Sequence, residues 1–319
     1  MNIDINIFLS LSFFVLGCIL LYFCSNSLID NSTLLSYKFN LSPIVVGATI
    51  IAIGTSLPEL LVSIYSIIFL DISQASSIII GNILGSNIAN IALVLGFCAF
   101  LYKIIFESNV IKDLILIFLL GIYAIICLHY EFNINYFHGI FLLAIFSFYL
   151  YNLIISNQIE HPNNTNISIN IFYVTSVILS SIIGLSIGTN LAVENALIIA
   201  DKLGFGELSV GLSIIALGTS LPELFTSLAA IKRKNYNLLI GNIIGSNIIN
   251  IVFVLGVSSL FSNIYINRDL IASSLPYIAI IFIASHLVII LSYVFKKSIS
   301  NFSGLVLLIL YLLFLYKLF

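Results

Sequence analysis

Residues 54–59 read Gly-Thr-Ser-Leu-Pro-Glu, a polar hexapeptide inside an otherwise apolar stretch, and residues 218–223 repeat it without change. The segments around them, 47–63 and 211–227, are identical at 12 of 17 aligned positions. The other apolar stretches of the two halves share little beyond being apolar. The sequence is therefore a duplication. The two segments that are largely identical in both halves are the best candidates for the functional site.

Each hexapeptide is followed by a companion motif. Residues 81–90 read Gly-Asn-Ile-Leu-Gly-Ser-Asn-Ile-Ala-Asn, and residues 241–250 read Gly-Asn-Ile-Ile-Gly-Ser-Asn-Ile-Ile-Asn. The paired glycines have the spacing that lets membrane helices approach closely. Ser86 and Asn90, like Ser246 and Asn250, are four residues apart and share a helix face. Their oxygens could bind a ligand or form hydrogen bonds between helices.

Composition makes this an integral membrane protein. Of its 319 residues, 61% are hydrophobic and only 8% are charged, too few charges to cover a surface that faces water. The apolar run 5–23 is longer than a signal-peptide core and has no cleavage pattern, so we expect it to be retained as a span. Lys232, Arg233 and Lys234 form the one basic cluster, which argues against a nucleic-acid partner.

A span needs about 20 apolar residues, and the sequence predicts ten helical spans in an all-α protein. We expect a first five-helix repeat over 1–155, a cytoplasmic linker over 156–169 and a second repeat over 170–319. The predicted spans are 5–24, 42–69, 74–102, 111–130, 134–155, 170–188, 208–231, 237–262, 270–295 and 301–318.

Because each repeat has an odd number of spans, the second copy is predicted to be inverted in the membrane. Eight Lys and Arg residues fall on one side of the predicted membrane, at positions 38, 103, 112, 232–234, 296 and 297. Three fall on the other side, at 202, 268 and 317. Cytoplasmic loops are rich in Lys and Arg, so this bias predicts both termini outside. The polar stretches 25–40 and 189–206 are predicted to be interfacial helices, with solvated acids at Asp30 and Glu194.

The hexapeptides carry the acids that lie deepest in the predicted membrane. An unpaired carboxylate there costs about 2.5–3.5 kcal/mol on insertion scales, and no Lys or Arg is placed at the depth of Glu59 and Glu223. Pro58 and Pro222 cannot donate a backbone hydrogen bond, so each helix should kink just before its acid and free carbonyl oxygens. Thr55 lies one helical turn before Glu59 and adds a hydroxyl to the same face.

Together the two halves offer carboxylate, hydroxyl, amide and carbonyl oxygens. This set of hard donors suits Ca²⁺ or Na⁺ rather than Zn²⁺ or Cu⁺. Two carboxylates balance one divalent or two monovalent ions, and competition between those loads is what an exchanger needs.

At these residues the chain resembles the cation/calcium exchanger superfamily, whose two alpha repeats would correspond to 47–96 and 211–256. The resemblance implies a secondary active antiporter of ten helices in two inverted repeats, exchanging Ca²⁺ against Na⁺ by alternating access. It also implies a monomer in the prokaryotic inner membrane, without cofactor or enzymatic activity, whose partners are inorganic cations and the lipid bilayer.

Carried over position by position, the resemblance implies two central carboxylates, flanking hydroxyls, two amides and two backbone carbonyls as cation ligands. They are Glu59, Glu223, Thr55, Ser56, Thr219, Ser220, Ser86, Ser246, Asn90, Asn250, Ala52 and Ala216. The sequence departs from several members of the superfamily at Asn250, where they carry Asp. The coupling ion therefore stays open between Na⁺, H⁺ and other monovalent cations.

Two other classes of protein deserve comparison. A channel would also use intramembrane oxygens, but an inverted duplication with one kinked motif in each half is the arrangement expected for alternating access. An intramembrane enzyme would need a nucleophile with a base, and Ser56 and Ser220 have no Lys or deep His nearby in sequence.

Overall fold

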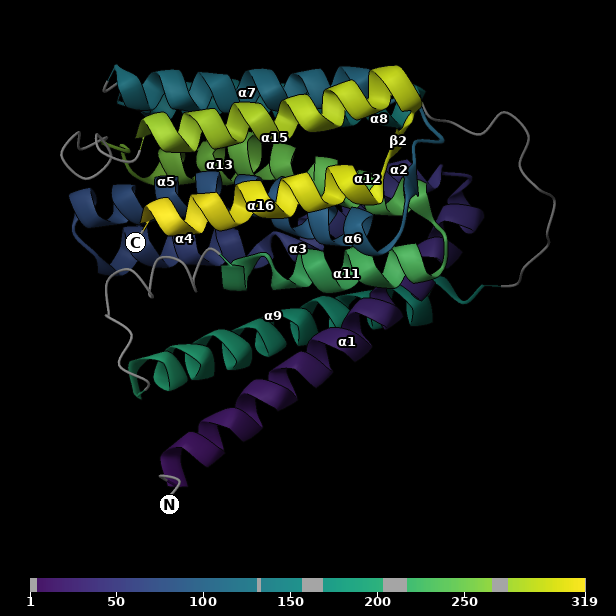
Figure 1. Ribbon diagram of the computed structural model, residues 1–319, viewed down its shortest axis with the longest axis horizontal. Helices are drawn as coiled ribbons and strands as arrows, with labels where there is room; N and C mark the ends of the chain where they lie inside the picture. The colour runs from purple at the N-terminus through teal and green to yellow at the C-terminus, as the bar shows by residue number, and fades with distance from the viewer. Residues whose placement is uncertain (1–4, 131–132, 157–168, 203–216, 266–274, 319) are drawn as a thin grey trace.

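The computed structural model describes residues 5–130, 133–156, 169–202, 217–265 and 275–318 as a bundle of long helices (Figure 1). In the first half these are α1 (Ile5–Phe39), α2 (Pro43–Val46), η1 (Gly47–Ile51), α3 (Ala52–Thr55), α4 (Leu57–Phe69), α5 (Ile72–Ile88), η2 (Ala89–Leu95), α6 (Gly96–Leu101), β1 (Ile104–Ile105), α7 (Ile111–His129) and α8 (Tyr136–Ser156).

The second half repeats much of this order. Its elements are α9 (Ile171–Lys202), α11 (Leu221–Lys232), α12 (Tyr236–Ile248), η3 (Ile249–Val254), α13 (Leu255–Phe261), α15 (Leu275–Lys296), β2 (Ser298–Ile299) and α16 (Asn301–Leu318). The η elements are π-helical turns within longer helices. The residues flanking them are helical, so α5, η2 and α6 form one continuous rod, as do α12, η3 and α13.

Within the described residues, seven helices are long and apolar enough to cross a membrane, and α16 is a shorter apolar helix. The predicted all-helical membrane architecture is therefore confirmed.

One expectation was wrong. The polar stretch 25–40 is not a separate interfacial helix, because α1 continues unbroken to Phe39, and α9 likewise runs through 189–202. Residues 25–39 and 189–202 contain no Gly or Pro. Polar side chains in α1, such as Asn26, Asn31 and Thr33, bond to carbonyl oxygens one turn earlier in the same helix. Residues 203–206 of the second predicted helix lie outside the described residues.

The motif helices form the centre of the bundle. In the most apolar part of the α12–α13 rod, 94% of residues are buried within the protein, and in that of the α5–α6 rod 83% are, against 17% in α1. A helix that is apolar all round and buried on every side belongs in the core. The centre is close-packed at Gly47 and Gly241, because a Cβ on Gly47 would lie 2.5 Å from the carbonyl oxygen of Leu238.

Helices α1 and α9 pack along each other in opposite directions at one side of the core (Figure 1). Helix α1 also contacts α11. The N-terminal end of α1 and the C-terminal end of α16 lie at the same end of the bundle, on the left of Figure 1, while β2 lies at the other end.

Short backbone pairings connect the two halves. Strands β1 and β2 are antiparallel, with Ile104 opposite Ile299, and Ile134 forms an antiparallel bridge with Ile264. Helix α7 separates Ile104 from Ile134 along the chain, so the two pairings lie at opposite ends of the bundle. Each pairing joins a segment of the first half to a segment of the second, so the two halves are linked at both ends of the core.

Candidate cation site

Both hexapeptides break their helices at the serine. Helix α3 ends at Thr55, Ser56 has φ −87° and ψ 7°, and α4 begins at Leu57. Ser220 has nearly the same conformation, with φ −86° and ψ 2°, before α11. The proline comes second in each new helix, where its missing N–H costs nothing. The predicted interruption before each acid is confirmed.

Glu59 and Glu223 consequently stand in the first turns of α4 and α11. The N-terminal end of a helix carries partial positive charge, which favours a carboxylate there. Both side chains are fully buried, and no Lys or Arg among the described residues is buried with them. The helix ends therefore supply part of the stabilisation that a cationic side chain would otherwise give.

The threonines connect each hexapeptide to the companion motif of the opposite half. Thr55 Oγ1 lies 3.3 Å from both Asn242 Oδ1 and Ser246 Oγ. In the mirror arrangement, Thr219 Oγ1 lies 3.3 Å from Asn82 Oδ1 and 3.1 Å from Ser86 Oγ. The site is thus assembled reciprocally, with each motif completed by the other half.

The two acids interact with this frame and with each other. Ser56 Oγ donates to Glu223 Oε1 at 3.3 Å, and Thr55 and Ser246 also lie close to the Glu223 carboxyl group. Ser86 and Thr219 lie beside the carboxyl group of Glu59, and this group also interacts electrostatically with the carboxyl group of Glu223. Both carboxyl groups therefore belong to one cluster.

Several buried oxygens of the hexapeptide and companion motifs have no hydrogen-bond donor among the described residues. They are both carboxyl oxygens of Glu59, Oε2 of Glu223, and the Oδ1 atoms of Asn90 and Asn250. A buried oxygen without a donor costs about 1–3 kcal/mol, and here five such atoms belong to four motif residues. Carboxylate and amide oxygens are hard ligands, so the donor set fits a hard cation such as Ca²⁺ or Na⁺.

Eleven of the twelve expected ligand residues are described, and each is at most 5% exposed. The carbonyl oxygen of Ala52 already accepts from Ser56 N at 3.0 Å and from Thr55 Oγ1 at 3.3 Å. Its equivalent, Ala216, lies outside the described residues. In the described part of the chain, no group of three His, Cys, Asp or Glu side chains could hold a metal ion.

Sequence reasoning missed the other asparagines of the companion motifs. Asn82 donates to the carbonyl oxygen of Glu59 at 3.2 Å, and Asn242 donates to Thr226 Oγ1 at 3.0 Å. Asn87 and Asn247 bond to Asn250 and Asn90 across the halves. The available signal was their exact repetition at matched positions within apolar helices.

Each companion motif ends in a π-helical segment, η2 or η3, which contains Asn90 or Asn250. The segment η1 lies opposite α12, against which it packs. Such wide turns are uncommon and are often found at functional sites. A π-helical turn changes the direction in which a side chain leaves the helix, and so it affects the orientation of the Asn90 and Asn250 amides.

Comparison with known proteins gives an independent view of these motifs. A sequence model of the family described as "Sodium/calcium exchanger protein" matches residues 9–155 and again residues 173–319. The uncharacterized membrane protein MJ0091 of Methanocaldococcus jannaschii is 39% identical over 258 residues, covering 80% of this chain and 83% of its own. The sodium/calcium exchanger MaX1 of Methanosarcina acetivorans is 28% identical and covers 96% and 97% of the two chains.

Solved structures give the same result. A structure of the sodium-calcium exchanger NCX_Mj soaked with 10 mM Na⁺ and no Ca²⁺ superposes with a TM-score of 0.79 at 34% identity, covering 96% of this chain and 97% of that one. Another, soaked without Na⁺ or Ca²⁺, has a TM-score of 0.77 at 33% identity. The whole bundle, and not the motifs alone, is therefore shared.

Proposed function

Because the chain belongs to the sodium/calcium exchanger protein family, we propose that it is a secondary active antiporter that exchanges Ca²⁺ against Na⁺. The observation that carries this proposal is the set of buried, donor-free oxygens on Glu59, Glu223, Asn90 and Asn250. They are hard ligands of the kind that both ions prefer. Two carboxylates can balance one Ca²⁺ or two Na⁺, so the ions would compete for one site.

We propose ten spans in two inverted repeats, over 1–155 and 170–319, joined by a cytoplasmic linker at 156–169. The alpha motifs would be 47–96 and 211–256. The reciprocal threonine contacts and the two interlocking backbone pairings support this symmetry. The opposite directions of α1 and α9 support an inverted relation between the first helices of the repeats (Figure 1).

In the proposed ion site, Glu59 and Glu223 are the central charged ligands. The neutral ligands are Thr55, Ser56, Thr219, Ser220, Ser86, Ser246, Asn90 and Asn250, with carbonyl oxygens of Ala52 and Ala216. The orphaned Oδ1 atoms of Asn90 and Asn250 give these two amides the strongest support among the neutral ligands. The Ala52 carbonyl would have to release or share a hydrogen bond on ion binding.

Transport would depend on competition between Ca²⁺ and Na⁺ for the site and on movement of the outer helices α1 and α9. An unloaded pair of buried carboxylates repel each other, and Ca²⁺ or Na⁺ would relieve that repulsion. Helices α1 and α9 pack beside the core and expose much apolar surface to the bilayer. We propose that they slide along the core to open the site to one side at a time. The protein would act as a monomer in the prokaryotic inner membrane.

The coupling ion is tested by flux into sealed proteoliposomes. We expect an outward Na⁺ gradient to drive ⁴⁵Ca²⁺ uptake, and equal gradients of K⁺ or choline to drive none. Uptake driven only by a pH gradient would replace Na⁺ with H⁺ as the coupling ion. Ca²⁺ flux that does not depend on any counter-ion would make the protein a channel and overturn the proposal.

A further inference from the structure

The two amides among the proposed ligands are each held by an asparagine of the opposite half. Asn90 Nδ2 donates to Asn247 Oδ1 at 3.2 Å, and Asn250 Nδ2 donates to Asn87 Oδ1 at 3.2 Å. All four side chains are completely buried. The two bonds are equivalent, because Asn87 corresponds to Asn247 in the repeated motif and Asn90 to Asn250.

These bonds decide which end of each ligand amide is left for an ion. An asparagine side chain has a donor end and an acceptor end, and only the oxygen can bind a cation. The donor ends of Asn90 and Asn250 are used by the partners, while their Oδ1 atoms have no donor among the described residues. Rotation of either amide by half a turn would present two N–H groups to the cation.

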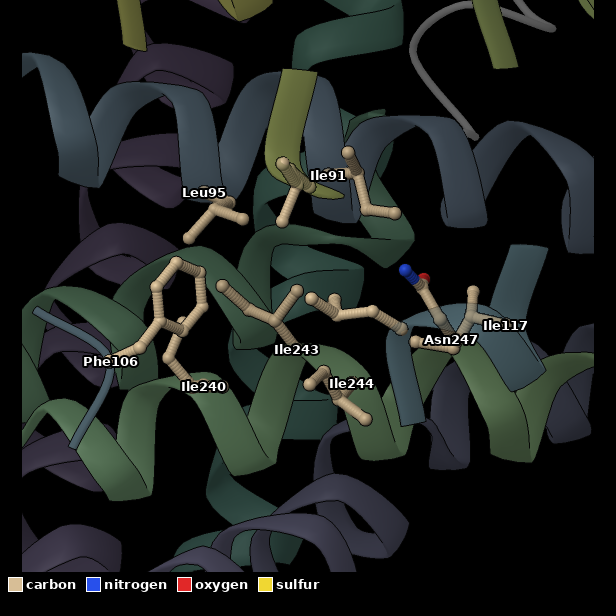
Figure 2. Close-up of a pocket in the computed structure, with 10 residues that line it drawn as sticks. Ile91, Leu95, Phe106, Ile117, Ile240, Ile243, Ile244 and Asn247 are labelled. Atoms are coloured by element: carbon tan, nitrogen blue, oxygen red, sulfur yellow. The ribbon is translucent and has the colours of Figure 1, made fainter. Parts of the chain in front are cut away.

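Asn87 is itself held by a second hydrogen bond. Asn87 Nδ2 donates to the backbone oxygen of Asn247 at 3.3 Å, so Oδ1 is the end that Asn87 offers to Asn250. Asn247 points toward a small cavity whose other walls are apolar, among them Ile91, Ile117 and Ile244 (Figure 2). Those walls offer no hydrogen bonds, and the buried Nδ2 of Asn247 has no acceptor among the described residues. The bond from Asn90 is therefore the side-chain hydrogen bond that the structure gives Asn247.

We infer that Asn87 and Asn247 are positioning residues that orient the amides of Asn250 and Asn90, so that each presents its oxygen to the transported cation. This role rests on the proposed function, because it presumes that Asn90 and Asn250 bind the ion. Each ligand amide is oriented from the other repeat, so both halves must be in register before the site can accept a cation. Asn87 also suits an amide at position 250, since an ionised carboxylate there could not donate to Asn87 Oδ1.

A double-mutant cycle tests this role in the full-length protein, with the KM for Ca²⁺ in Na⁺-driven uptake as the readout. Asn87→Ala should raise this KM by about tenfold, with little change in maximal rate. A tenfold change corresponds to the usual free-energy cost of leaving one buried polar group without its hydrogen bond. If Asn87 acts through Asn250, adding Asn87→Ala to Asn250→Ala should cause no further increase. The control joins Asn87→Ala to Thr55→Ala. The two increases should multiply there, because Thr55 bonds to Asn242 and Ser246, whereas Asn87 bonds to Asn247 and Asn250.

Multiplying effects in the Asn87 and Asn250 pair, or an unchanged KM in Asn87→Ala, would show that Asn87 has only a packing role and would overturn the inference. If Asn87→Ala does not fold, the equivalent cycle of Asn247→Ala with Asn90→Ala makes the same test, with Thr55→Ala in the control pair. A wild-type protein that shows no Ca²⁺ uptake in any ion gradient would instead overturn the proposed function and, with it, this role.

Discussion

Glu59 and Glu223 are buried acids whose charge has no cationic side chain to neutralise it among the described residues. Such a pair is a cost to the folded protein and an asset for binding a cation, because the same low dielectric strengthens both repulsion and ion attraction. The two acids therefore have separable effects on transport and on stability.

Glu59→Gln and Glu223→Gln should each abolish Ca²⁺ exchange, because each removes half of the negative charge that opposes a doubly charged ion. Both variants should still insert into the membrane, since Gln keeps the shape of the side chain. Na⁺-driven ⁴⁵Ca²⁺ uptake measures the effect, with protein amount checked by immunoblot. Normal uptake in either variant would show that its acid is not a ligand.

The same substitutions should stabilise the empty protein by on the order of 1–3 kcal/mol, because a buried charge without a partner is removed. Melting in cation-free detergent buffer should occur at a higher temperature than in wild type. Added Ca²⁺ should raise the melting temperature of wild type, through binding to the folded state, and leave the variants unchanged. Earlier melting of both variants would mean that the carboxylates hold the fold together.

Asn250 is the position where the chain departs from several members of its superfamily, and Asn250→Asp should keep exchange but make it sensitive to acid. In the proposed ion site the change adds a third carboxyl group to the two of Glu59 and Glu223, and their mutual repulsion favours proton uptake when no cation is bound. Protons should then compete with Ca²⁺ at the acid end of the range. Initial rates between about pH 6 and 9 decide this, and superimposable profiles of wild type and variant would place Asn250 outside the ion shell.

At the scale of helices, the most visible contact outside the core joins α1 to the end of α11. Arg233 Nε and Nη2 donate to the two carboxyl oxygens of Asp30 at 2.7 and 2.9 Å, and Nη1 donates to Asn26 Oδ1 at 2.8 Å. The side chains are 33% and 58% exposed. The predicted solvated acid is thus partly exposed, and it is also a link between a peripheral helix and the core.

Arg233→Ala should destabilise the protein by less than about 1 kcal/mol, because exposed ion pairs are weak and screened by salt. Asp30→Asn should have the same effect, and the two changes together should cost no more than either alone. Thermal melting at low salt measures this, and the difference from wild type should shrink in about 1 M salt. Lys234→Gln serves as the charge-removal control, and a loss in that variant equal to the loss in Arg233→Ala would assign the effect to net charge.

For the molecule as a whole, the start of α1 and the end of α16 lie at one end of the helical bundle. The paired strands β1 and β2 lie at the other end (Figure 1). Lys38 at the end of α1, Lys232 at the end of α11 and Lys296 at the end of α15 belong to helix ends near β2 in this layout. This agrees with the uneven distribution of Lys and Arg in the sequence, which predicts that the β2 end faces the cytoplasm.

Cysteine labelling tests this orientation. In a variant without native cysteines, Lys234→Cys should be protected from a membrane-impermeant maleimide in intact cells and labelled after lysis. Lys202→Cys, at the opposite end of the predicted topology, should be labelled in intact cells. The reverse pattern would invert the protein in the membrane and place both termini inside.

The sequence by itself determined the membrane class, the duplication and the helix breaks before the two acids. Composition fixes the solvent that a chain can tolerate, and Pro58 and Pro222 impose local constraints that no tertiary contact needs to supply. It also identified Glu59, Glu223, Asn90 and Asn250 as candidates, because polar side chains repeated within apolar helices stand out by their cost.

Only the tertiary structure decided which atoms of these residues face one another. Hydropathy divided α1 near residue 25, whereas the folded helix runs on to Phe39. Its Asn26, Asn31 and Thr33 side chains bond to carbonyl oxygens one turn earlier and so remain compatible with the helix. The pairing of Asn87 with Asn250 and of Asn247 with Asn90 joins residues more than 150 positions apart. Helix periodicity relates only residues within a turn or two, so the orientation of those amides depends on how the two halves pack.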